Sequence, residues 1–227
     1  MRESILTIPI NEIFEPKCEC PICRMRNMLE DRTVEYIMGA AMMEPDVRTE
    51  TNKLGFCKTH FEKMQVQKNR LSLALMLQSH LKEIDSEIFK KAGLFDNKKA
   101  KKIKLANLNC DCFVCSKIEW GMERLLDTFF EMYQKSEDFR KLFNMQEMLC
   151  LSHYEILISM AQTKLQKGNI DMFIKDCQTL TKKYLDILIN DVSHYCSMYD
   201  YRNTGKNADW GNSKDSIERA IKFLTTR

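Results

Sequence analysis

Residues 18–23 read CECPIC and residues 110–115 read CDCFVC, so three cysteines fall within six residues at two places in the chain. Each cysteine group is followed by a second short motif, CKTH at residues 57–60 and CLSH at residues 150–153. A CxxC pair and a CxxH pair therefore occur in the same order twice. This recurrence decides how the rest of the sequence is interpreted.

The two pairs of motifs belong to an internal duplication. Cys57 follows Cys23 by 34 residues, and Cys150 follows Cys115 by 35 residues. Acidic and arginine residues keep the same register when they are counted from Cys23 and from Cys115: Asp31 and Glu123, Arg32 and Arg124, Glu35 and Asp127, Asp46 and Asp138, Arg48 and Arg140. Matched positions at a fixed period indicate repeated structural units.

The duplication divides the chain into four predicted segments. They are a first metal-binding helical repeat at 1–92, a linker at 93–109, a second metal-binding helical repeat at 110–199 and a C-terminal loop and helix at 200–227. The linker holds five lysines between Lys98 and Lys104 but no aromatic residue among them for base stacking, so nucleic acid is not favoured as a partner. Ser213 is the predicted N-cap of the final helix.

The composition favours helices. Seven glycines and four prolines in 227 residues leave few turn signals, whereas helix-forming residues are abundant. Apolar residues at spacings of three and four predict helices at 71–91 and 170–199, and we expect further helices after each cysteine group, at about 24–43 and 117–135. The predicted fold is all-α: a helical bundle from two duplicated metal-clipped halves, plus a C-terminal loop and helix.

The net charge and the number of cysteines limit the expected partners and the expected cellular compartment. A net charge of +3 gives no field that favours nucleic acid or a membrane surface. The opening residues lack the apolar core of a signal peptide, and no stretch reaches the roughly 18 apolar residues of a membrane span. Ten cysteines without an export signal indicate a reducing cytoplasm, where close-set cysteines more often bind metal or do redox work. We expect a cytoplasmic protein without a membrane partner.

The spacing of the motifs predicts two metal sites. A CxxC turn presents two sulfurs to one ion, and a CxxH at the start of a helix supplies one sulfur and one nitrogen. We assign the ligands within each repeat: Cys20, Cys23, Cys57 and His60 in the first, and Cys112, Cys115, Cys150 and His153 in the second. Three thiolates and one imidazole form a closed structural shell for zinc, so we expect two Zn²⁺ per chain.

Cys18 and Cys110 leave an alternative open. Each gives its repeat a fifth candidate ligand, so a four-cysteine shell, which also suits an iron–sulfur cluster, is an alternative. The two residues are also compatible with reactive thiols or with small buried side chains. The alternative function is therefore an iron–sulfur or thiol-based redox protein.

Other polar residues give no complete catalytic set. His80 lies on an apolar helical face and is expected to be a hydrogen-bonded core histidine. His194 follows Asp191 by three residues and is a weak candidate for a carboxylate-oriented histidine, and Asp46 and Arg48 are expected to form an ion pair. We therefore predict a binding or regulatory module rather than an enzyme.

Long segments in order along the chain also indicate a relationship. The segments are IPINEIFEPKCECPIC from residue 8, MEPDVRTETNKLGFCKTH from residue 43, NRLSLALMLQSHL from residue 69 and YDYRNTGKNADWGNSKDSIERAI from residue 199. Together they resemble an uncharacterised bacterial family, a domain of unknown function with a duplicated CxCPxC...CxxH motif. The resemblance implies a cytosolic, helical, metal-binding protein. It brings no reaction and leaves the partner, a protein or a small molecule, and the oligomeric state unspecified.

Overall fold

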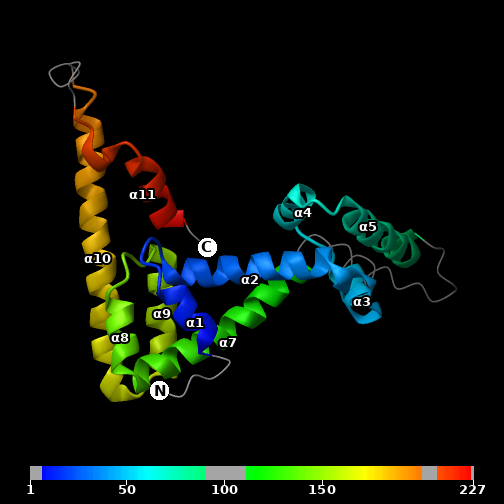
Figure 1. The fold of residues 1–227 in the computed structure, drawn as a ribbon, viewed down its shortest axis with the longest axis horizontal. Helices are drawn as coiled ribbons and strands as arrows, with labels where there is room; N and C mark the ends of the chain where they lie inside the picture. Colours follow the sequence, from blue (N-terminus) through cyan, green and yellow to red (C-terminus); the bar gives the residue numbers. More distant parts are fainter. Residues whose placement is uncertain (1–6, 90–110, 201–208, 226–227) are drawn as a thin grey trace. The chain divides into compact units, whose positions relative to one another are not determined.

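The computed structural model describes residues 7–89, 111–200 and 209–225, and within these ranges every regular element is a helix (Figure 1). The prediction of an all-α fold is confirmed. The α-helices are α1 (Ile8–Phe14), α2 (Pro21–Met38), α3 (Pro45–Leu54), α4 (Lys58–Val66), α5 (Arg70–Ile84), α7 (Phe113–Lys135), α8 (Glu137–Asn144), α9 (Leu151–Lys164), α10 (Lys167–Ser197) and α11 (Ser216–Thr225). Shorter turns are η1 (Ala40–Met43), η2 (Asp85–Phe89) and η3 (Gly211–Ser213).

The chain forms two compact units. Unit 1 contains Met1–Met25 and Arg124–Arg227, and unit 2 contains Arg26–Glu123. Their boundaries fall inside α2 and α7, so each unit combines parts of both predicted repeats. The units therefore differ from the segments 1–92 and 110–199 of the sequence analysis, and the duplication stays a prediction about the sequence.

Helices α2 and α7 begin within the cysteine groups, directly after Cys20 and Cys112, and so earlier than the predicted residues 24 and 117. Pro21 is the first residue of α2, a position where its fixed backbone angle suits a helix and its missing N–H costs nothing. At 18 residues, α2 is about 27 Å long, so it leads the chain away from the CxxC pair at its start. The length of α2 determines which of the Cys and His residues can come together.

Unit 1 is held by an aromatic core. Phe14 of α1 stacks on Phe129 of α7, with ring centroids 5.6 Å apart, and Phe129 meets Phe173 of α10 edge-on at 6.1 Å. Phe139 and Phe143 of α8 contact both Phe14 and Phe129. Such ring pairs contribute about 0.5–1.5 kcal/mol each beyond their buried area. They hold together the helices of the unit that contains the first CxxC and the second CxxH.

Unit 2 has an aliphatic and methionine core. Its buried residues include Val34, Ile37 and Met38 of α2, Met64 of α4, Leu73 and Met76 of α5, and Phe113, Val114 and Ile118 of α7. The α5 helix begins at a cap, because the Asn69 side chain accepts a hydrogen bond from the Ser72 amide and donates one to the Met38 carbonyl. The predicted apolar face of α5 is half-buried: Leu73 is buried, whereas Leu77 is only partly so.

The C-terminal part departs from two predictions. Ser213 lies in η3 and its hydroxyl donates to the Trp210 carbonyl, so it is not the cap of α11, which begins at Ser216. At the end of α10, Tyr199 is 67 % exposed, although the sequence placed it on the buried face. The lysine-rich linker at 93–109 and Cys110 lie outside the described residues.

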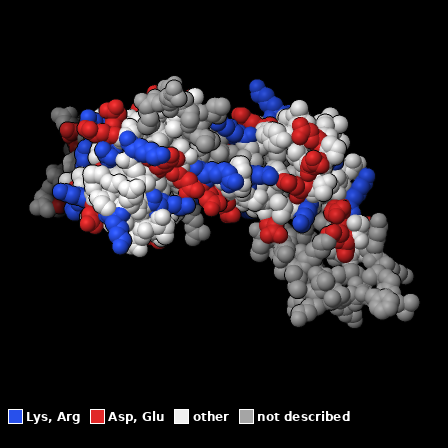
Figure 2. Space-filling model, turned by 90° about the horizontal axis from the view of Figure 1, so that it is seen from below, with Lys and Arg blue, Asp and Glu red and all other residues white. Residues whose placement is uncertain are grey.

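One face of the molecule can be seen to have mixed charge (Figure 2). On the face seen in Figure 2, positive and negative side chains alternate without forming an extended region of one sign. Among the described helices, none has both the length and the apolar character that a membrane crossing needs.

Candidate metal centres

The structure brings the eight predicted ligands together in two groups. Centre 1 consists of Cys20, Cys23, Cys150 and His153, and centre 2 consists of Cys57, His60, Cys112 and Cys115. In each centre all four ligand atoms lie within 4.8 Å of one another. The predicted pairing of the motifs within each repeat is wrong: each centre combines the CxxC of one repeat with the CxxH of the other. Each centre lies within one compact unit.

The length of the connecting helix gives the physical reason. After Cys23 the chain follows α2 into unit 2, and the short elements η1 and α3 lead it to Cys57 without returning it to unit 1. In the same way α7 leads the chain from the second CxxC in unit 2 to Cys150 in unit 1. Because the motifs are duplicated, either pairing supplies the same donor types, so spacing alone does not distinguish them.

Both centres are built from two helix N-termini. Cys20, Cys57, Cys112 and Cys150 each immediately precede the first residue of a helix, and their carbonyls accept the amides of Arg24, Phe61, Ser116 and Tyr154. The second ligand of each pair lies three residues later, in the first helical turn. The positive ends of two helix dipoles thus point at each donor set and favour negatively charged thiolates.

In centre 1 the His153 ring faces the three sulfurs through Nδ1. This nitrogen lies 3.1 Å from Cys150 Sγ, 3.2 Å from Cys23 Sγ and 3.6 Å from Cys20 Sγ. The sulfurs of Cys23 and Cys150 are 3.6 Å apart, too far for a disulfide, whose sulfurs are bonded at about 2.05 Å. All four side chains are buried, with His153 only 3 % exposed.

Centre 2 repeats this arrangement. The His60 Nδ1 lies 3.1 Å from Cys57 Sγ, 3.2 Å from Cys112 Sγ and 3.5 Å from Cys115 Sγ. His60 and Cys112 are buried, whereas Cys57 and Cys115 are partly exposed. Centre 2 is therefore more accessible to solvent than centre 1.

The donor spacing fits a single tetrahedral ion. Zinc–sulfur bonds of about 2.3 Å and zinc–nitrogen bonds of about 2.0 Å place the donors of a tetrahedral shell roughly 3.5–3.8 Å apart. The shortest separations in both centres, 3.1 Å, fall a few tenths of an ångström below that range, and the longer ones reach it. The residues present therefore fit a four-coordinate ion held by three sulfurs and one nitrogen.

The thiols of the two centres differ in acidity: hydrogen bonds from Cys20 and Cys23 hold the pKa of Cys150 well below its usual range, whereas Cys23 and Cys115 are poor acids. Hydrogen bonds to Cys150 and Cys20 hold the pKa of Cys23 well above its usual range, and burial raises the pKa of Cys115 to about 12. Burial opposes protonation of His153, but hydrogen bonds to the Cys150 and Cys20 sulfurs raise its pKa to about 9. Metal binding requires deprotonated ligands, so it releases protons and weakens as the pH falls.

Different contacts hold the two motifs of each centre together. In centre 1 the Arg24 Nε donates to the Ile13 carbonyl at 3.0 Å, and its Nη2 donates to Gln146 Oε1 at 2.9 Å. The Gln146 Nε2, on a side chain only 2 % exposed, donates to the Phe14 carbonyl at 2.7 Å. These side chains connect the first CxxC, helix α1 and the turn before Cys150.

In centre 2 a backbone hydrogen bond joins the two motifs. The Phe113 amide donates to the Gly55 carbonyl at 3.0 Å, which joins the start of α7 to the turn before Cys57. Gly55 has a φ of 62°, and a Cβ there would lie 2.8 Å from His80 Nε2. Glycine is required at this position because the backbone is left-handed and the His80 ring lies directly over it.

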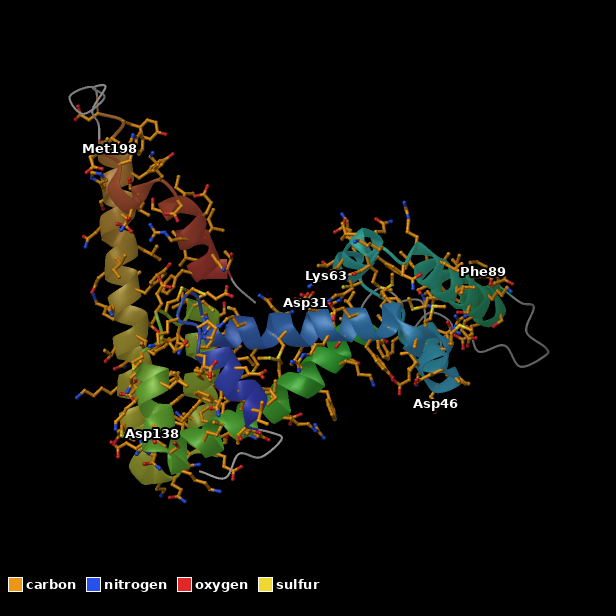
Figure 3. The ribbon with its side chains drawn as sticks, viewed as in Figure 1. Asp31, Asp46, Lys63, Phe89, Asp138 and Met198 are labelled. Carbon is orange, nitrogen blue, oxygen red and sulfur yellow. The ribbon has the colours of Figure 1, made fainter. Side chains whose placement is uncertain are left out.

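Two side chains near centre 2 were not predicted from the sequence. The Glu30 Oε1 lies 2.9 Å from His60 Nε2, and its Oε2 lies 2.7 Å from Lys63 Nζ. Lys63 also lies 2.6 Å from Asp31, and both are labelled in Figure 3. An acidic residue two turns after a cysteine pair is a common surface feature, so nothing in the sequence indicated that Glu30 contacts a ligand.

The remaining candidates lie apart from the two donor sets. Cys18 is exposed, with its sulfur 3.7 Å from Arg24 Nη1, and is not among the grouped ligands. His80 is half-buried and its Nδ1 lies 2.7 Å from the Asn52 carbonyl, as expected for a hydrogen-bonded histidine. The other two predicted pairs differ: Arg48 donates to the Leu75 carbonyl rather than to Asp46, and His194 contacts the Asp209 carbonyl.

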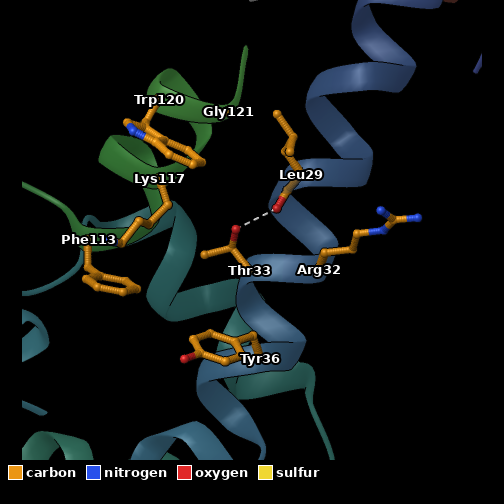
Figure 4. A pocket seen from close by; sticks show the side chains of 8 residues that line it. All are labelled: Leu29, Arg32, Thr33, Tyr36, Phe113, Lys117, Trp120 and Gly121. Carbon is orange, nitrogen blue, oxygen red and sulfur yellow. Dashed lines mark hydrogen bonds between the residues drawn. The ribbon is translucent and has the colours of Figure 1, made fainter. Parts of the chain in front are cut away.

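Unit 2 also has an apolar surface groove between α2 and α7 (Figure 4). Its volume is about 290 Å³. The lining residues are Leu29, Arg32, Thr33 and Tyr36 of α2 and Phe113, Lys117, Trp120 and Gly121 of α7. The side chains of Trp120 and Tyr36 are 58 % and 52 % exposed, which is unusual for large aromatic residues.

Comparison with known proteins gives one match. Residues 1–227 match the model of a family of unknown function (DUF6062), and the chain belongs to this family. No curated protein and no solved structure matches the chain. The resemblance found in the sequence is thus confirmed as a family relationship, and the family assigns no reaction or ligand.

Proposed function

We propose that this member of the DUF6062 family is a zinc protein with two structural ions, one per compact unit, and that it acts as a binding or regulatory module. Each ion would join the CxxC of one repeat to the CxxH of the other. The single observation that supports this most is the donor set: three cysteine sulfurs and one histidine nitrogen, within 4.8 Å of one another, at each of two helix junctions. Such sets bind structural zinc.

The structural role follows from the completeness of each shell. Four protein donors saturate a tetrahedral ion and leave no position for water or substrate, which a catalytic zinc needs. When bound, the ion would supply a cross-link between two helix N-termini, and its binding free energy would add to the stability of the fold. Cys20, Cys23, Cys150 and His153 would hold one ion, and the four residues of centre 2 would hold the other.

The spacing argues against the iron–sulfur alternative. A cluster distributes its cysteine ligands over more than one iron, so four donors would be spread more widely than a single-ion shell. The groups instead converge on one point, with Cys23 and Cys150 sulfurs 3.6 Å apart. Cys18, the extra cysteine that the structure describes, is exposed and outside centre 1.

The groove between α2 and α7 supports the binding part of the proposal. Exposed tryptophan and tyrosine side chains beside an apolar groove are typical of interaction surfaces. Lys117 at its edge is paired with Glu50 at 2.9 Å and lies over the Phe113 ring, so the groove itself is mainly apolar.

Elemental analysis of protein purified without a metal-binding tag tests the proposal, together with an absorption spectrum recorded without exposure to oxygen. We expect about two zinc ions per chain and no visible absorption band. Cys177→Ala is the matched control, because Cys177 is buried in α10 but belongs to neither centre, and this variant should keep both ions. Iron with a broad visible band would contradict the proposal and establish the redox alternative, and a metal-free folded protein would contradict both.

A further inference from the structure

The His60 ring connects centre 2 to a carboxylate. Its Nδ1 faces the three sulfurs, and its Nε2, on the opposite side of the ring, lies 2.9 Å from Glu30 Oε1. The His60 side chain is only 4 % exposed and the Glu30 side chain 20 % exposed, so little water competes for this contact. Both ring nitrogens of His60 therefore have a defined partner.

The carboxylate of Glu30 is itself fixed in place. Its second oxygen, Oε2, lies 2.7 Å from Lys63 Nζ, and Lys63 is on α4, one turn after His60. Lys63 also contacts Asp31 at 2.6 Å. The two oxygens of Glu30 are thus divided between a histidine and a lysine of the same helix, which defines the orientation of the carboxylate.

This arrangement selects one tautomer of His60. A carboxylate accepts hydrogen bonds and does not donate them, so the Nε2 of a neutral His60 carries the proton. Nδ1 is then unprotonated, and its lone pair points at the three sulfurs. Carboxylates that orient a metal-binding histidine in this way also make it a stronger donor.

The second repeat has no carboxylate at the position equivalent to Glu30. Glu30 lies seven residues after Cys23, and the residue seven after Cys115 is Met122. Met122 is partly buried against the core of unit 2, and a thioether is only a weak acceptor. The two repeats thus share their ligand types but differ at this position.

We propose that Glu30 is a positioning residue for centre 2: it holds His60 in the Nε2–H tautomer and thereby slows metal loss from the more exposed of the two centres. The proposal rests on the proposed function, because it requires an ion in centre 2. Loss of comparable carboxylates costs about 10- to 100-fold in metal affinity.

Three variants of the full zinc-loaded chain test the proposal. Glu30→Met introduces the residue of the second repeat, Glu30→Gln keeps an oxygen that can accept from Nε2, and Asp31→Asn alters the other acidic partner of Lys63 without touching His60. The measurements are the rate of zinc release to a chromophoric chelator and the rate at which the His60 Nε2 proton exchanges with solvent, followed by nitrogen-15 NMR. Thermal unfolding checks that each variant is folded.

Glu30→Met should accelerate the release of one zinc about 10- to 100-fold and leave the other unchanged, with faster exchange of the His60 Nε2 proton. Glu30→Gln should restore slow proton exchange and most of the slow release, and Asp31→Asn should behave as wild type. Wild-type zinc release and proton exchange in Glu30→Met would overturn the inference, as would equal acceleration at both centres. If the wild-type chain itself holds fewer than two zinc ions, the proposed function fails before the variants are compared.

Discussion

Centres 1 and 2 have the same donors at the same helix positions but different surroundings. Every residue of centre 1 is buried, whereas Cys57 and Cys115 of centre 2 are partly exposed. Centre 1 is held by side chains, chiefly Arg24 and Gln146, and centre 2 by the backbone bond from Phe113 to Gly55. The motif thus determines the donor set, while the residues around it determine how the two motifs are held.

One residue pair explains part of this difference. Phe113, the first residue of α7, donates its amide to Gly55, but the equivalent first residue of α2 is Pro21, which has no amide hydrogen. The position equivalent to Gly55, two residues before Cys150, is Met148. Centre 1 therefore lacks the donor of the backbone link, and the Arg24–Gln146 contacts join its motifs instead.

Removing a ligand should have the largest effect and should act on one centre at a time. Cys150→Ala and Cys57→Ala should each remove about one zinc and lower the free energy of unfolding of the affected unit by more than about 4 kcal/mol, because the cross-link between two helices is lost. The loss should be greater for Cys150, which is 0 % exposed. Metal analysis and chemical unfolding measure both effects. Equal loss of both ions from either variant would show that the centres are not independent.

Gln146 tests the side-chain contacts of centre 1. Gln146→Leu leaves the Phe14 carbonyl and the Arg24 guanidinium without their buried partner, so we expect a loss of about 2–3 kcal/mol in unfolding free energy. Zinc release should become faster at centre 1 only. The exposed residue Glu147 next to it offers a control, since Glu147→Gln should change stability by less than about 0.5 kcal/mol. If Gln146→Leu leaves both the unfolding free energy and the zinc release at centre 1 unchanged, these contacts do not hold the centre.

A substitution at Gly55 tests the backbone contact of centre 2, and we expect a somewhat smaller loss of stability than for Gln146→Leu. Gly55→Ala places a side chain on a residue with a φ of 62° and against the His80 ring, at an expected cost of about 1–3 kcal/mol. Gly168→Ala is the matched control, because a Cβ there meets nothing within 4 Å and α10 favours alanine, so stability should stay within about 1 kcal/mol. Thermal unfolding measures the stability of both variants. Equal stability of Gly55→Ala and Gly168→Ala would show that Gly55 is not needed to hold centre 2.

The fold class and the approximate positions of α2, α5, α7, α10 and α11 could be predicted because they depend on local sequence, whereas no residue range was predicted for α1, α3, α4, α8 and α9. Few glycines and prolines, and apolar residues at helical spacing, are properties of each segment alone. The eight Cys and His residues of the motifs could be named because CxxC and CxxH are local motifs, and they lie in two groups, although not in the predicted ones. That they bind metal remains a prediction.

The pairing of the motifs could not be predicted, because a duplicated sequence offers two chemically equivalent combinations. Only the path of α2 and α7 distinguishes them. Glu30, Arg24 and Gln146 were missed for a related reason: each acts through a partner that is distant in the chain, such as Gln146, which lies 132 residues from Phe14. A single sequence contains no signal for such contacts.

Two double variants test the crossed pairing most directly. In Cys23→Ala/Cys150→Ala both changes fall in centre 1, so the chain should keep about one tightly bound zinc after dialysis against a weak chelator. In Cys23→Ala/Cys57→Ala each centre loses one ligand, so both ions should become extractable. If the first variant instead loses both ions and the second keeps one, the motifs pair within each repeat and the account of the two centres is wrong.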